Sequence, residues 1–95
     1  MTTKNEYIDS LAAELKAWGA QIDLLAAKKD KAAAHAQLKY VEELDALRIH
    51  QHAAAEKIKE LEESSGEAWV TVKATADKVW EDFRVGMASA ASKFN

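Results

Sequence analysis

The sequence predicts an all-α protein built from amphipathic helices, and three observations support this fold class. The chain has 95 residues with no proline and only three glycines, so the residues that most often interrupt helices are nearly absent. Large apolar residues recur at alternating steps of three and four, which places them on one side of a helix. Capping sequences occur near Thr3 and near Ser64. We therefore predict one helical domain over residues 1–95, with a turn near 64–66.

The first helix is predicted to begin near Lys4, because Thr3-Lys4-Asn5-Glu6 has the form of a capping box. Its apolar seam thins after Leu25 and resumes at Tyr40. The stretch around Lys28–Lys31 has no glycine, no proline and no capping residue better than Asp30. The pattern therefore favours one continuous helix over about residues 4–63.

The second helix is predicted over about residues 66–94. Ser64 and Glu67 have the spacing of another capping box, and Gly66 permits a sharp change of direction. So short a connection implies that the two helices are antiparallel neighbours. The expected core of this hairpin is Tyr40, Leu44, Leu47, Ile58, Leu61, Trp69, Val72, Val79, Phe83 and Phe94.

The two predicted helices differ in length, and this difference implies self-association. At 1.5 Å per residue the first would be roughly 90 Å long and the second roughly 43 Å. The second helix could then cover only half of the first, and an uncovered apolar stripe marks a partner surface. We expect an antiparallel dimer or a higher bundle of this chain. The predicted oligomer interface is Ile8, Leu11, Leu15, Trp18, Ile22 and Leu25.

A monomeric three-helix bundle is the alternative architecture. If the chain also bends near Lys28–Lys31, it forms three segments of about 25–30 residues that can close on one another. The two architectures are related by domain swapping and contain similar contacts.

Composition and charge exclude several classes of function. The net charge is −3 and neither predicted helix carries a basic stripe, which argues against a nucleic-acid partner. Cysteine is absent, so disulfides and thiolate metal sites cannot form. No apolar run approaches the roughly 20 residues of a membrane span, and the first residues lack the apolar core of a secretory signal. We expect a cytoplasmic protein.

The histidines are the only candidates for metal binding. His50 and His52 would point in different directions on a helix, whereas His52 and Glu56 are four residues apart and can lie together. Two ligands alone make a poor site. His35, near the middle of the long helix, would approach its symmetry mate in an antiparallel dimer. We expect solvated histidines and predict no metal site; a metal- or pH-responsive bundle using His35 or His52 is an alternative.

No pattern of residues in the chain predicts catalysis. The carboxylates fall in runs typical of a solvated helix face, the serines have no histidine at useful spacing, and no glycine-rich phosphate loop is present. We therefore predict neither enzymatic activity nor a cofactor. The second helix is amphipathic, so binding to a lipid or granule surface is an alternative. Its balanced charge argues against that alternative, because interfacial helices carry an excess of Lys and Arg.

Several segments resemble a family of small bacterial coiled-coil stress-response proteins. The segments are Glu6-Tyr7-Ile8, Leu15-Lys16-Ala17-Trp18, Ile22-Asp23, Ser65-Gly66-Glu67-Ala68-Trp69, Val72-Lys73, Trp80 and Ala91-Ser92-Lys93-Phe94. The sequence departs from the family at His50 and His52, where relatives usually carry charged residues. The resemblance implies a bacterial, stress-induced protein with no catalytic residues to carry over. Together with the helical pattern, it leads us to expect a non-enzymatic structural or interaction protein that forms a coiled-coil oligomer.

Overall fold

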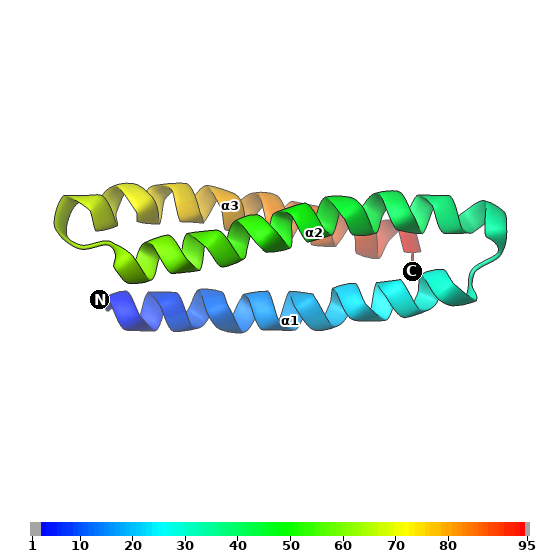
Figure 1. The fold of residues 1–95 in the computed structure, drawn as a ribbon, viewed down its shortest axis with the longest axis horizontal. Helices are drawn as coiled ribbons and strands as arrows, with labels where there is room; N and C mark the ends of the chain where they lie inside the picture. Colours follow the sequence, from blue (N-terminus) through cyan, green and yellow to red (C-terminus); the bar gives the residue numbers. More distant parts are fainter. Residues whose placement is uncertain (1–2, 95) are drawn as a thin grey trace.

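The computed structural model describes residues 3–94, which form three helices packed side by side (Figure 1). Helix α1 spans Lys4–Lys31, α2 spans Ala34–Glu63 and α3 spans Gly66–Phe94. The bundle is a rod with extents of 51 × 19 × 17 Å. Helices α1 and α3 run in the same direction and α2 runs against both (Figure 1). The prediction of an all-α fold is confirmed.

The predicted continuous helix over residues 4–63 is wrong, because the chain turns at Ala32 and Ala33. Both residues have extended backbone angles, with ψ near 154° and 151°. Turning back lets α1 bury its apolar face, which is worth about 1.5–3 kcal/mol for each large side chain. An interrupted helix loses a few backbone hydrogen bonds of about 0.5–1.5 kcal/mol each. Packing therefore outweighs helix continuity, and the chain has the three-helix topology of the alternative prediction.

The apolar seam of α1 lies inside the bundle. Ile8, Leu11, Trp18, Ile22 and Leu25 are buried, and Leu15 is partly buried and packs against them. The prediction that these six residues stay uncovered without a second copy is wrong, because α2 and α3 of the same chain cover them. Self-association itself stays a prediction.

The core predicted for the C-terminal hairpin is present. Leu44, Leu47, Leu61 and Phe83 are buried, and Tyr40, Ile58, Trp69, Val72, Val79 and Phe94 are partly buried against that core. Five further residues complete it: Ala54, Ala76, Trp80, Met87 and Ala90. A contiguous core along all three helices follows.

The two predicted capping boxes behave differently. Thr3 caps α1 as predicted, since its hydroxyl accepts a hydrogen bond from the Glu6 amide at 3.1 Å. Ser64 does not cap α3. Its hydroxyl donates to the Leu61 carbonyl at 3.0 Å and so caps the end of α2. Gly66, at φ +59°, then reverses the chain as expected.

Candidate functional site

A groove runs along the bundle surface between α1 and α3. Both helices pack closely along α2, but they approach each other much less closely. The groove contains two hollows that follow one another along the rod. The hollow nearer the N-terminus of α1, which we call the lower hollow, lies between residues 7–14 of α1 and 77–88 of α3. It has a volume of about 710 Å³. The hollow nearer the C-terminal ends of the two helices, which we call the upper hollow, lies between residues 21–28 of α1 and 87–94 of α3. It has a volume of about 230 Å³.

Large side chains bridge α1 and α3 beneath the groove. The Trp18 and Phe83 rings lie 4.5 Å apart between centroids, and Tyr7 meets Trp69 edge-on at 5.6 Å. The guanidinium of Arg84 lies 5.9 Å from the Trp18 ring centroid and bonds the Glu14 carboxylate at 3.1 Å. The aromatic rings pack between α1 and α3, whereas the Arg84–Glu14 ion pair is exposed and crosses the groove at the surface.

The Tyr7 hydroxyl links α1 to α3 near the N-terminus of α1. It donates a hydrogen bond to a carboxylate oxygen of Asp77. Burial raises the pKa of Tyr7 above its ordinary value, and the hydrogen bond and the negative charge of Asp77 raise it further. The hydroxyl thus stays protonated and able to donate over the whole physiological range.

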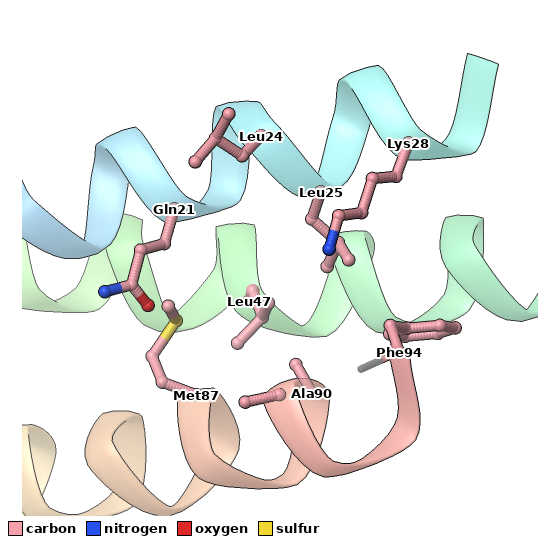
Figure 2. A pocket seen from close by; sticks show the side chains of 9 residues that line it. Gln21, Leu24, Leu25, Lys28, Leu47, Met87, Ala90 and Phe94 are labelled. Atoms are coloured by element: carbon pink, nitrogen blue, oxygen red, sulfur yellow. The ribbon is translucent and has the colours of Figure 1, made fainter. Parts of the chain in front are cut away.

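The upper hollow has an apolar floor and a polar edge. Its floor comes from Leu25 of α1, Leu47 of α2, and Met87 and Ala90 of α3, and Phe94 closes one end (Figure 2). Along α1, the side chains of Gln21 and Lys28 extend toward α3 (Figure 2). An apolar floor beside a few polar groups is typical of a binding surface.

Two large apolar residues stand exposed at the edges of the groove. Leu24 beside the upper hollow is 65 % exposed, and Val85 beside the lower hollow is 64 % exposed. Neither residue is indicated by the apolar pattern, because both lie one or two positions outside the predicted seams. The sequence did offer one indication of these two residues. Leu24 directly precedes the core residue Leu25, and Val85 follows the core residue Phe83 by two positions.

The lower hollow also reaches Trp80, which is buried to 1 % exposure. Among residues 3–94 the indole N–H of Trp80 finds no hydrogen-bond acceptor. A buried donor without an acceptor costs about 1–3 kcal/mol, so this indole stabilises the fold less than its burial alone suggests.

The candidate metal ligands do not form a site in the part of the chain that the structure describes. His35 lies exposed in the first turn of α2, and His52 and Glu56 are exposed further along that helix. No group of three or more His, Asp or Glu side chains within residues 3–94 could hold a metal ion. His50, expected to be solvated, is half-buried instead, with its ring 5.8 Å from the Phe83 ring centroid.

Within the described residues, no helix is long and apolar enough to cross a membrane. No family model, no curated protein and no solved structure matches the chain. The resemblance to bacterial stress-response coiled-coil proteins therefore stays a prediction, and the groove is interpreted from its own geometry.

Proposed function

We propose that this chain is a non-enzymatic interaction protein that acts as a homo-oligomer through the groove between α1 and α3. The observation that carries the proposal is the pair of exposed apolar side chains, Leu24 and Val85, beside two adjoining hollows. Single exposed apolar residues are common on protein surfaces. Two of them at the edges of one groove form a larger apolar surface, and we call them the two anchors.

The register of α1 against α3 places the two anchors close together along the rod. Trp18 lies beside Phe83, 65 residues on in sequence, and Glu14 bonds Arg84, 70 residues on. At these offsets the level of Val85 lies roughly 6–13 Å from that of Leu24, toward the N-terminal end of α1. A two-fold axis perpendicular to the rod, midway between these levels, would place Leu24 of one copy at the level of Val85 of the other and bring the four apolar side chains together across the groove.

Charge supports the same arrangement. Lys28 follows Leu24 by four residues, and Glu81 precedes Val85 by four, so each charge lies one turn from its apolar neighbour. In an antiparallel pairing, Lys28 of one copy lies at the level of Glu81 of the other, and its long side chain can reach across the groove to that carboxylate. Within residues 3–94 neither side chain forms an ion pair. Each intermolecular pair contributes about 0–1 kcal/mol, and it selects the register more than it adds affinity.

The dimer is tested by sedimentation velocity across a concentration series. Leu24→Ser should weaken association, because it removes an apolar side chain worth about 1.5–3 kcal/mol when buried, twice per dimer. Ile49→Ser is the matched control: Ile49 is 70 % exposed on α2, away from the groove. Lys28→Glu and Glu81→Lys should each weaken the dimer, and together they should restore it. A monomeric wild-type protein, or equal effects of Leu24→Ser and Ile49→Ser, would contradict the proposal.

The lipid-surface alternative has less support. Its candidate helix, α3, buries the apolar face that a lipid surface would need, since Trp80, Phe83 and Met87 lie in the core. Liposome flotation separates the two ideas, because a protein bound through the groove to a second copy stays in the bottom fraction.

A stress-associated role is the remaining part of the proposal, and its support is the sequence resemblance. Quantitative proteomics of the host cell before and after osmotic or oxidative shock tests it. The role predicts an increase in abundance, and unchanged abundance under both shocks would contradict it without affecting the groove dimer.

A further inference from the structure

The two-residue link between α1 and α2 has no local feature that requires a turn. Ala32 and Ala33 have φ values of −78° and −62°, from which rotation of ψ alone reaches the helical region. Ala34 and Ala36 follow directly, so the link lies in a stretch with the highest helix propensity. The local sequence therefore favours the helix that the fold interrupts.

The start of α2 lacks the usual helix-start interactions. Its capping position is Ala33, no side chain accepts a hydrogen bond there, and the first turn contains no acidic residue. The side chain of Gln37, in the first turns of α2, stabilises this turn. Its amide donates to the carbonyl oxygens of Lys29 at 3.3 Å and Ala32 at 3.2 Å. One glutamine thus supplies the side-chain hydrogen bonds that hold this turn in the described chain.

We propose that α1 is exchanged between two copies of this chain, with Ala32 and Ala33 becoming helical so that residues 4–63 form one helix. Each α1 would then pack on α2 and α3 of the other copy and bury Ile8, Leu11, Trp18, Ile22 and Leu25 as it does within one chain. The exchanged dimer deepens the proposed function, since it makes a second copy the partner. It concerns the core, whereas the proposed function concerns the groove.

The equilibrium between the two forms depends on the link and on protein concentration. The core contacts are the same in both, so they cancel. Opening the link loses the two Gln37 hydrogen bonds and the favourable position of Lys28, Lys29 and Lys31 at a helix C-terminus. It gains the backbone hydrogen bonds of a continuous helix. Because the exchanged form contains two chains, its population rises with concentration.

Distance measurement between two spin labels distinguishes the forms, and the natural chain has no cysteine to interfere. Ala20→Cys with Ala46→Cys places exposed labels 26 residues apart across the link. In the hairpin the labels lie on neighbouring helices, about 8–10 Å apart between axes. In a continuous helix they are about 39 Å apart. With labelled protein diluted into unlabelled protein, the long distance should appear and grow with total concentration.

A second label pair provides the matched control. His52→Cys with Lys78→Cys has the same spacing across the turn at Ser64–Gly66, and both positions are exposed. This pair should show only the short distance at every concentration, because Gly66 sits at φ +59°. A long distance that appears equally in both pairs would indicate general unfolding and would overturn the proposal.

Ala33→Pro sharpens the test. Proline suits the observed φ of −62° at position 33 and the extended Ala32 before it, but it cannot continue a helix. It should abolish the long distance while leaving the hairpin folded. Persistence of the long distance in this variant would overturn the exchange.

The Leu24→Ser background separates the two proposals. A long distance that survives in Leu24→Ser supports exchange independently of the groove. A wild-type protein that is dimeric yet shows only the short distance overturns exchange and leaves the groove dimer in place.

Discussion

The turn at Ala32–Ala33 and the turn at Ser64–Gly66 join helices of nearly equal length but are stabilised in opposite ways. The second turn has a glycine at φ +59° and a serine hydroxyl that caps the helix before it. The first has two alanines in ordinary extended conformation and no side-chain cap on the following helix. The second turn is therefore specified locally, whereas the first exists because α1 packs on the other two helices.

The N-terminus of α1 adds to this difference. The Lys4 ammonium donates to the carbonyl oxygens of Ser64 and, at 3.4 Å, Glu62, so α1 also braces the second turn. The first turn has no comparable contact from α3 in the described structure. Perturbing the core should thus affect the first turn most, and perturbing local backbone chemistry should affect the second.

The largest expected effect comes from the buried face of α1, whose packing the first turn depends on. Ile22 is 2 % exposed, and Ile22→Ala should lower the free energy of unfolding by about 2–5 kcal/mol because it leaves a cavity. Hydrogen exchange should accelerate in α1 more than in α2 and α3. Ile49→Ala, at a position of α2 that is 70 % exposed and away from the groove, is the control and should change stability by about 0.5 kcal/mol or less. Uniform acceleration in all three helices would show that the first turn does not depend specifically on α1 packing.

A smaller loss is expected from Gly66→Ala. A side chain at φ +59° is strained by about 1–2 kcal/mol, and an added Cβ has no neighbour within 4 Å, so the cost is purely conformational. Urea denaturation should report this loss. Ala33→Gly is the comparison at the first turn, because glycine can keep the extended backbone angles of Ala33. Its effect should be clearly smaller, and equal losses would contradict the contrast between the turns.

Ala33→Pro should stabilise the single-chain fold by about 0.4–1 kcal/mol, because proline restricts the unfolded chain and fits the native angles. Thermal unfolding at low protein concentration measures this, where the single-chain form dominates. A lower melting temperature would mean that the Ala33 conformation in solution differs from the extended one.

Gln37→Ala should destabilise the first turn by about 0.5–1.5 kcal/mol, because two hydrogen bonds to helix-end carbonyls are lost. Ser64→Ala, which removes one such bond at the second turn, is the matched comparison. Urea denaturation of both variants shows which turn loses more free energy of unfolding when its side-chain hydrogen bonds are removed. No change on Gln37→Ala would mean that core packing alone maintains the first turn.

The smallest expected effect is the contribution of Tyr7 to the pH dependence. Its pKa is raised in the folded state above the ordinary value of 10.0, so folding holds the proton more tightly. The contribution of Tyr7 to the free energy of unfolding is fully present below about pH 10. It declines as the pH rises from there through the folded-state pKa of Tyr7. The difference in unfolding free energy between wild type and Tyr7→Phe should thus shrink from pH 9 to 11. A constant difference would rule out this linkage.

Several features could be read directly from residue spacing. The start of α1 follows from Thr3, the second turn from Gly66, and the bounds of α3 from its apolar seam. The seams also predicted the core, since a step of three and four keeps side chains on one helix face wherever that face is covered. The groove could not be predicted, because it depends on how Trp18, Phe83, Tyr7 and Trp69 pack between two helices that are far apart in sequence.

The sequence by itself determined that this chain is helical, where its apolar faces lie and that it reverses at Gly66. Only the tertiary structure decided that it also reverses at Ala32–Ala33, and therefore that the seam from Ile8 to Leu25 is covered by its own chain. The physical reason is one of magnitude. Local helix propensities differ by tenths of a kcal/mol per residue, whereas covering an apolar helix face contributes several kcal/mol and can override an alanine run.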